Sequence, residues 1–308
     1  MNLTKIAVTS LSFSKNNILR SELLSLFPNA KFNETGKILT GAGLIEFLDG
    51  YAGSIVGLET IDIDLIDSCQ NLKFISKYGV GLDNLDLDYC KQKNIEIGWT
   101  GGVNKLSVAE MALGFMLSLS RNLYQSSLYL KDGAWFKNGG SQLSGKTIGI
   151  IGVGFIGKEL IRLLAPFNCK ILVNDIIDQD KYYELNNLIK SEKEEIYSQS
   201  DIITIHTPLT DFTRNLINKE SISKMKKSVI IINSARGGIV EQNDLKFALE
   251  TGQIAGAALD VYEIEPPIDN DLLKINNLFC TPHIGGNSAE AVLAMGRSAI
   301  NHLKNYFF

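Results

Sequence analysis

The chain has 308 residues, of which 45% are hydrophobic and 21% are charged. This composition is that of a globular protein and excludes intrinsic disorder, and the length is enough for two domains. Thirty basic and thirty-four acidic side chains leave a net charge of −4. That balance excludes a general nucleic-acid binder, which needs a positive surface, but it does not exclude small anionic ligands.

The cysteines and the N-terminal region indicate the compartment. Cys69, Cys90, Cys169 and Cys280 have no metal-ligand spacing, so we expect four reduced thiols and no metal. The first residues carry no signal-peptide pattern, and no apolar run approaches the roughly 18 residues that span a bilayer. We therefore expect a soluble, cytoplasmic protein.

Short β-branched runs alternate with amphipathic stretches along the first third of the chain. This alternation is typical of βαβ units, in which helices cover both faces of a parallel sheet. The expected strands are Ile6–Thr9, Ser54–Gly57, Leu72–Ser76 and Ile95–Gly98, and the expected helices are Asn16–Leu26, Ile63–Cys69 and Asp86–Lys93.

Two long amphipathic helices are expected to divide the chain. One is Ser107 to about Leu123, for which Ser107 and Glu110 predict a capping box at the start. The other is Ser288 to about Leu303, with His302 expected to face solvent. If both are crossovers, residues 1–100 and 286–308 form a discontinuous domain, and residues 101–285 form the second.

The segment after the first crossover helix is rich in glycine and carries Trp135 and Phe136. An excursion of this length is uncommon inside a compact domain. It fits either an arm that contacts a second subunit or a lid, and we favour an arm at about 121–144, because exposed aromatic side chains more often mark interfaces.

The second domain repeats the alternating pattern with apolar runs typical of strands buried on both faces. The expected strands are Thr147–Gly152, Lys170–Asp175, Ile202–His206, Val229–Asn233, Ala255–Asp260 and Leu278–Cys280.

A glycine-rich turn follows the first of these strands and precedes a helical stretch, Lys158–Ala165. Gly152 permits the tight turn, Gly154 lets a pyrophosphate approach the backbone, and Gly157 lets the helix pack against the sheet. The helix N-terminus then offers free N–H groups to phosphates. Asp175 ends the next strand, where it can bind ribose hydroxyls and repel a 2′-phosphate, so the pattern predicts NAD rather than NADP.

Three downstream strands each deliver a charged or titratable residue to the same expected sheet edge. Arg236 can bind a carboxylate with two hydrogen bonds. His283 can donate a proton near neutral pH, and Glu265 can orient the ring and favour its charged form. With a nicotinamide, this set predicts reduction of a 2-keto acid or oxidation of a 2-hydroxy acid. His206, also at a strand end, is the rival acid.

Taken together, these motifs resemble the D-isomer-specific 2-hydroxyacid dehydrogenase family. The likeness rests on the glycine fingerprint and on the motifs Ser-Ala-Arg236-Gly-Gly, Glu265-Pro and Thr-Pro-His283-Ile-Gly-Gly. An upstream signature of the family is matched by Tyr78-Gly-Val-Gly-Leu-Asp-Asn84. The resemblance implies two doubly wound parallel-sheet α/β domains, a flavodoxin-like substrate domain and a Rossmann NAD-binding domain. It also implies a homodimer built around the crossover helix and the arm.

The resemblance further implies the site residues. Arg236, Glu265 and His283 are the implied catalytic set, with His283 the acid and base. The implied substrate-binding residues are Lys77, Gly79, Val80, Gly81, Arg236 and His283. The expected cofactor-binding residues are Gly152, Gly154, Phe155, Ile156, Gly157, Asp175, His206, Thr207, Pro208, Ser234, Ala235, Arg236, Asp260, His283, Gly285 and Gly286.

Within the family, the chain is most similar to the phosphoglycerate dehydrogenase and hydroxypyruvate or glyoxylate reductase branch. Phosphoglycerate dehydrogenase activity is our leading interpretation. Gly57, Lys77 and Lys137 stand where that branch tends to have phosphate-binding arginines, which leaves an unphosphorylated substrate open. A third hypothesis is an NAD(H)-sensing, partner-binding protein on the same fold. Since the sequence stops at Phe308, we expect no appended regulatory domain.

Overall fold

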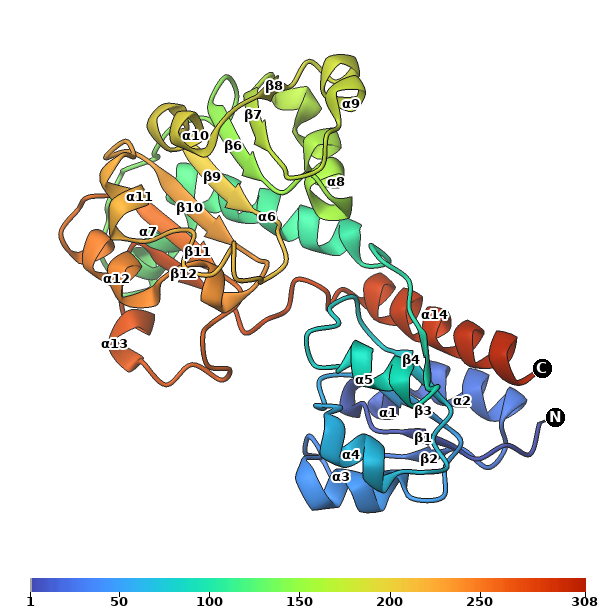
Figure 1. Cartoon of the computed structure of the whole chain (residues 1–308). Coiled ribbons are helices and arrows are strands. Elements are labelled where there is room, and N and C mark those ends of the chain that lie inside the picture. The colour runs from blue at the N-terminus through green and yellow to red at the C-terminus, as the bar shows by residue number, and fades with distance from the viewer. Residues whose placement is uncertain (1) are drawn as a thin grey trace. The chain divides into compact units, whose positions relative to one another are not determined.

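The computed structural model describes residues 2–308. The chain forms two compact units (Figure 1). The first unit contains the residues up to Asn104 together with Gly286–Phe308, and the second contains Lys105–Gly285. Among residues 2–308, no helix combines the length and the apolar character that a bilayer crossing requires.

The first unit is built on a five-stranded sheet in which all paired strands are parallel, with the order β2-β1-β3-β4-β5. This is the flavodoxin-like order. Its strands are β1 (Ile6–Val8), β2 (Lys31–Phe32), β3 (Gly53–Val56), β4 (Phe74–Lys77) and β5 (Glu96–Gly98). Its helices are α1 (Leu11–Lys15), α2 (Asn17–Leu26), α3 (Gly41–Leu48), α4 (Ile63–Ser68), α5 (Leu87–Gln92) and α14 (Ala289–Phe307).

Helices cover both faces of this first sheet, as the fully buried strands β1, β3 and β4 require. On one face α1, α2 and α14 pack against the strands around Phe13, Leu23 and Leu303. On the other face α3, α4 and α5 pack around Leu48 and Ile75. The C-terminal helix is therefore part of the hydrophobic core of the unit that begins the chain.

The second unit contains a seven-stranded parallel sheet with the order β12-β11-β10-β9-β6-β7-β8. The order reverses between β6 and β9, as in the Rossmann fold, and ligands bind at such a switch point. The strands are β6 (Thr147–Ile151), β7 (Lys170–Asn174), β8 (Ile189–Lys190), β9 (Ile202–Ile205), β10 (Ile230–Asn233), β11 (Gly256–Leu259) and β12 (Leu278–Cys280).

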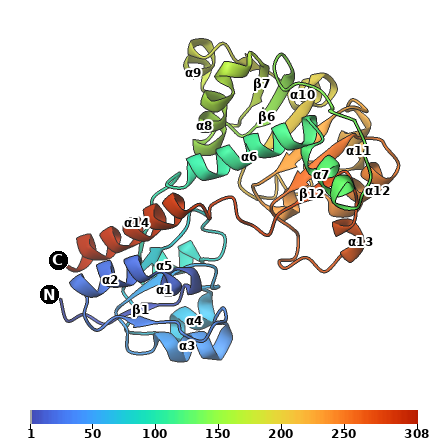
Figure 2. The ribbon, with the colours of Figure 1, turned by 180° about the vertical axis from the view of Figure 1, so that it is seen from behind.

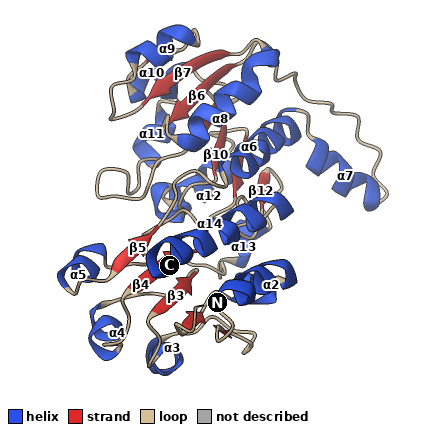
Figure 3. Cartoon of the chain, turned by 90° about the vertical axis from the view of Figure 1, so that its right-hand side faces the viewer, coloured by secondary structure: helices blue, strands red, loops and turns tan. Residues whose placement is uncertain are grey.

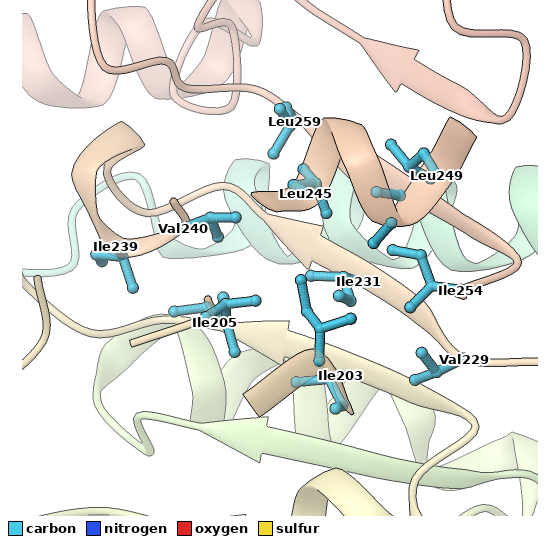
Figure 4. Close-up of a cluster of buried hydrophobic side chains, with 14 of the residues drawn as sticks. Ile203, Ile205, Val229, Ile231, Ile239, Val240, Leu245, Leu249, Ile254 and Leu259 are labelled. Carbon is cyan, nitrogen blue, oxygen red and sulfur yellow. The ribbon is translucent and has the colours of Figure 1, made fainter. Parts of the chain in front are cut away.

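Two helical layers enclose this second sheet. Figure 2 shows α6 running along one face of the sheet beside α8. Figure 4 shows the core on the other face, where Leu245 and Leu249 of α12 lie over Ile203 and Ile231. The helices are α6 (Lys105–Ser120), α7 (Leu123–Lys131), α8 (Phe155–Leu164), α9 (Asp180–Leu185), α10 (Lys193–Gln199), α11 (Lys219–Ser223), α12 (Gln242–Glu250) and α13 (Asn270–Leu273), with 3₁₀ turns at Ala165–Phe167 and Gly237–Ile239.

The predicted fold class of two parallel-sheet α/β domains is confirmed. Every strand expected from the sequence is present within two residues of its predicted ends. The pattern missed only the two-residue strands β2 and β8, which are too short to show an alternating or continuous apolar run.

The predicted capping box at Ser107 is wrong. Helix α6 begins at Lys105, so Ser107 lies inside its first turn. The Ser107 hydroxyl instead donates a hydrogen bond to the carbonyl of Gly285 at 2.6 Å. The Ser107 hydroxyl therefore makes a tertiary hydrogen bond and does not cap the start of the helix, as the local pattern had predicted.

The segment expected to be an arm begins with a helix that the sequence analysis did not predict. Figure 3 shows α7 standing away from the sheet of its own unit. Near its start, Tyr124 stacks on Phe279 with ring centroids 4.4 Å apart. Beyond its end, Trp135 is 78% and Phe136 is 60% exposed.

Candidate active site

The glycine-rich turn lies at the carboxyl end of β6, beside the point where the strand order reverses. Gly152 has a φ of +97°, which favours glycine. A Cβ on Gly152 would lie 2.6 Å from the carbonyl carbon of His206, and one on Gly157 would overlap the carbonyl of Gly152. At Gly154 a Cβ would meet no atom within 4 Å. Two glycines thus permit close backbone packing, and the third leaves open space for a ligand.

The start of α8 and the end of β7 face this turn. Helix α8 begins at Phe155, directly after Gly154, and no side chain caps its N-terminus. Such an end attracts phosphate groups. Asp175 follows β7 and accepts hydrogen bonds from the backbone N–H groups of Val153 at 2.6 Å and Ile177 at 2.8 Å. The carboxylate is therefore held against the glycine-rich turn.

Three polar side-chain atoms near the ends of β9 and β10 are buried and have no hydrogen-bond partner within residues 2–308. They are Nδ1 of His206, Oγ1 of Thr207 and Oγ of Ser234. Buried polar groups without partners are costly, so these atoms fit a polar ligand such as a dinucleotide. Burial also lowers the pKa of His206 to about 4, which leaves the ring neutral near pH 7 and unsuited to the rival role of acid.

Arg236 is positioned by the turn that follows β10. The side chain of Asn233 accepts a hydrogen bond from the N–H of Ala235 and donates one to the carbonyl of Arg236 at 2.8 Å. At Gly237 a Cβ would overlap the backbone of Tyr262. The glycine therefore lets the segment that carries Arg236 lie directly against the loop that follows β11.

Glu265 is held by the same loop. The backbone N–H of Tyr262 donates to Oε1 of Glu265 at 3.1 Å. The Tyr262 hydroxyl donates to the carbonyls of Leu259 and Thr281 at 3.3 and 3.0 Å. One tyrosine thus links the Glu265 loop to the end of β11 and to the segment that carries His283.

A buried aspartate anchors the loop around His283. Oδ1 of Asp260 accepts hydrogen bonds from the Thr281 hydroxyl and from the N–H of Ile284, and Oδ2 accepts one from the N–H of Gly285. Asp260 is 1% exposed. Between these anchored residues, His283 has a φ of +54°, a left-handed conformation that non-glycine residues seldom adopt.

His283 and Glu265 form a close pair. Nδ1 of His283 lies 2.6 Å from Oε2 of Glu265, and about two fifths of each side chain remains exposed. This hydrogen bond raises the pKa of His283 and outweighs the opposing effect of burial. Burial would raise the pKa of Glu265, but the bond to His283 and the charge of Arg236 leave that pKa lowered. Within residues 2–308, Nε2 of the ring has no hydrogen-bond partner.

The remaining predicted residues are divided between the two units. Lys77, Gly79, Val80, Gly81 and Gly286 belong to the first unit. The buried ammonium of Lys77 donates to the Gly57 carbonyl at 2.5 Å and to Oδ1 of Asn84 at 2.6 Å. Within the second unit, Phe155 and Pro208 are exposed at the sheet edge, and Lys137 is exposed beyond α7.

Two residues that hold this site together were not predicted from the sequence. Asn233 orients the turn of Arg236, and Tyr262 links Glu265 to Thr281. Both stand inside motifs that were recognised, three residues before Arg236 and Glu265. Their positions at strand ends could have indicated them, but an uncharged side chain gives no sign of its partners.

A Rossmann-type parallel sheet, a glycine-rich dinucleotide turn and a paired histidine and glutamate define an NAD-dependent oxidoreductase. Residues 113–285 match the NAD binding domain of the D-isomer specific 2-hydroxyacid dehydrogenases. Hydroxypyruvate reductase of Thermotoga maritima is 40% identical over 246 residues, which cover 77% of this chain and 78% of that protein. The chain belongs to the D-isomer specific 2-hydroxyacid dehydrogenase family, and NAD is its cofactor.

Two further comparisons agree. D-3-phosphoglycerate dehydrogenase of Methanocaldococcus jannaschii is 39% identical over 246 residues, 78% of this chain. The match covers 47% of that relative, so the chain spans about half its length. The structure of D-lactate dehydrogenase from Aquifex aeolicus with NAD and lactic acid superimposes with a TM-score of 0.87 and 25% identity, covering 98% of this chain and 95% of the other.

Proposed function

We propose that the chain oxidises and reduces a short D-2-hydroxy acid and its 2-keto acid, with Arg236, Glu265 and His283 as catalytic residues. The observation that carries this proposal is the 2.6 Å contact between Nδ1 of His283 and Oε2 of Glu265. It gives a histidine with one free ring nitrogen and a raised pKa, at the sheet edge that binds the dinucleotide.

In the reductive direction, His283 donates a proton from Nε2 to the oxygen of the substrate carbonyl. Glu265 accepts the hydrogen bond from Nδ1 and stabilises the charged ring before transfer. In the oxidative direction the same nitrogen removes the proton from the hydroxyl group. Bound NAD(H) supplies or accepts the hydride at C2 of the acid.

Arg236 binds the substrate carboxylate in this proposal. A guanidinium offers two parallel N–H groups that match the two oxygens of a carboxylate. In the first unit, we propose that the backbone N–H groups of Val80 and Gly81 bind a carboxylate group. Among residues 2–308 neither N–H donates to a protein acceptor, which supports this role.

Residues around the glycine-rich turn bind the cofactor. Gly154 and the start of α8 hold the pyrophosphate, and Asp175 holds the adenosine ribose. The buried atoms of His206, Thr207 and Ser234, which have no hydrogen-bond partner within residues 2–308, supply polar contacts to the cofactor. The carboxylate of Asp175 favours NAD over NADP, because it repels a 2′-phosphate.

The substrate has either a phosphorylated or an unphosphorylated side chain. Relatives named D-3-phosphoglycerate dehydrogenase favour a phosphorylated substrate. Relatives named hydroxypyruvate reductase and glyoxylate reductase favour an unphosphorylated one. The Lys77 ammonium, which the sequence offered as a phosphate ligand, is 5% exposed and is bonded to Gly57 and Asn84. This observation favours an unphosphorylated substrate.

We further propose that the protein is a cytoplasmic homodimer. The exposed Trp135 and Phe136, together with the apolar side chains of Leu123, Leu128 and Leu130 on α7, form a surface that a second copy of the chain covers. The four free thiols are compatible with a reducing compartment.

The deciding experiment follows NADH oxidation with glyoxylate, hydroxypyruvate, pyruvate and 3-phosphohydroxypyruvate. Turnover that falls on the order of 10²–10⁴-fold in His283→Ala, with NADH affinity retained, supports the assignment. Preference for 3-phosphohydroxypyruvate would contradict an unphosphorylated substrate. Tight NADH binding without turnover of any acid would favour the partner-binding sensor, which pull-down with and without NADH would then test.

A further inference from the structure

The loop between β4 and α5 carries the backbone that the proposed function assigns to the substrate carboxylate. It is anchored at both ends. At its start, the N–H of Tyr78 donates to the carbonyl of Val56 at 2.9 Å, and the Tyr78 ring packs edge-on against Phe13. At its end, the amide of Asn84 bonds to Lys77 and to the carbonyls of Gly57 and Glu59.

The middle of this loop has little intrinsic stiffness. Val80 stands between Gly79 and Gly81, and Gly79 has a φ of +127°. Glycine on both sides lets the intervening peptide units rotate at low cost. Without a further contact, the Val80–Gly81 peptide could turn over while both ends of the loop stayed in place.

Trp99 supplies that contact. It follows β5, and its indole Nε1 donates a hydrogen bond to the carbonyl oxygen of Val80 at 2.9 Å. Within residues 2–308, this is the sole hydrogen bond that joins Gly79, Val80 or Gly81 to another part of the chain. The indole ring is 41% exposed, so packing alone does not account for its placement.

The backbone on each side of Trp99 is itself fixed. A Cβ on Gly98 would lie 2.5 Å from Cβ of His302 and 2.6 Å from the Phe74 ring, so this glycine lets β5 lie close to α14. On the other side, Oγ1 of Thr100 lies 2.8 Å from Nε2 of His302, which corrects the expectation that His302 faces solvent. The Ser298 hydroxyl also donates to Thr100 at 3.0 Å.

We propose that Trp99 is a positioning residue that orients the Val80–Gly81 peptide for the substrate carboxylate. A trans peptide is planar, and its C=O and N–H point in opposite directions. When Trp99 holds the carbonyl of Val80, the N–H of Gly81 must point away from the indole, and residues 2–308 offer this N–H no acceptor. The N–H is thereby kept available for an anionic group. This inference rests on the proposed function.

The test compares Trp99→Phe with Trp135→Phe. The first change keeps an aromatic ring but removes the N–H donor, and the second makes the same change at the other tryptophan of the chain. For Trp99→Phe we expect KM for the 2-keto acid and the inhibition constant of oxalate to rise together by about five- to tenfold, as for one lost hydrogen bond. The kcat and the dissociation constant of NADH should stay within about twofold.

Hydrogen–deuterium exchange of the peptide covering residues 78–84 gives a readout independent of turnover. Exchange should be faster in Trp99→Phe than in the wild type and unchanged in Trp135→Phe. Unchanged KM and oxalate inhibition in Trp99→Phe would overturn the role of Trp99 while leaving the proposed function intact. A wild-type protein that reduces no 2-keto acid would overturn the proposed function, and this inference with it.

Discussion

The left-handed backbone of His283 is held in place by Asp260, a residue 23 positions earlier in the chain. The Asp260 carboxylate accepts the backbone N–H groups of both residues that follow the histidine. A strained conformation persists only where its surroundings enforce it, and here the buried side chain of Asp260 supplies that constraint. The direction of the imidazole toward Glu265 is therefore set by the loop as well as by the pair itself.

Replacing Asp260 by asparagine tests this arrangement. The amide keeps one acceptor oxygen but presents an NH₂ group where a second acceptor stood, so one buried N–H loses its partner. We expect the free energy of unfolding to fall by about 1–3 kcal/mol and turnover to fall with it. Urea denaturation measures the first effect. Asp211→Asn, at an exposed position, is the matched control and should change neither the free energy of unfolding nor turnover.

Glu265→Gln should move the pH dependence of reduction. The hydrogen bond to Glu265 raises the pKa of His283 above its ordinary value of 6.5. Since reduction needs the protonated ring, kcat/KM falls as the pH rises through this raised pKa. A neutral glutamine stabilises the cation less, so the fall should begin at a lower pH. A pH profile of keto-acid reduction checks the shift, and an unmoved profile would count against the pairing.

Asp175→Ala should relax the choice of cofactor. The carboxylate follows β7 beside the glycine-rich turn, where it repels a 2′-phosphate. We expect the ratio of kcat/KM for NADH over NADPH to fall by at least about tenfold, the effect of roughly 1.4 kcal/mol. Steady-state assays with both cofactors measure the ratio. A wild-type preference for NADPH would already contradict this role.

Gly237→Ala should separate the two loops that carry the proposed catalytic residues. A Cβ there would overlap the backbone of Tyr262, so the segment of Arg236 must move away from the Glu265 loop. We expect a loss of kcat/KM of about 10²-fold, as for a misplacement of roughly 1 Å at an active site. Gly114→Ala is the control, because no atom lies within 4 Å of its added Cβ and helix α6 favours alanine. Equal activity of both variants would contradict the argument.

The sequence predicted the parts of the fold that strong local patterns encode. Buried apolar runs marked the strands, and the glycine spacing before α8 marked the dinucleotide turn. The capping box at Ser107 was wrong because a hydroxyl has no local signal that reveals a distant partner such as Gly285. Trp99 was overlooked for the same reason, since its contact with Val80 depends on how β4 and β5 are placed side by side.

The first unit is completed by the last residues of the chain. Helix α14 buries Leu303 and Met295 in its core, and the Ser76 hydroxyl of β4 donates to the carbonyl of Ala299 at 2.8 Å. During synthesis, the ribosome therefore releases the second unit in full before the first can close its core. Until then, one apolar face of the N-terminal strands is covered only in part, by α1 and α2, and a chaperone can bind the rest of it.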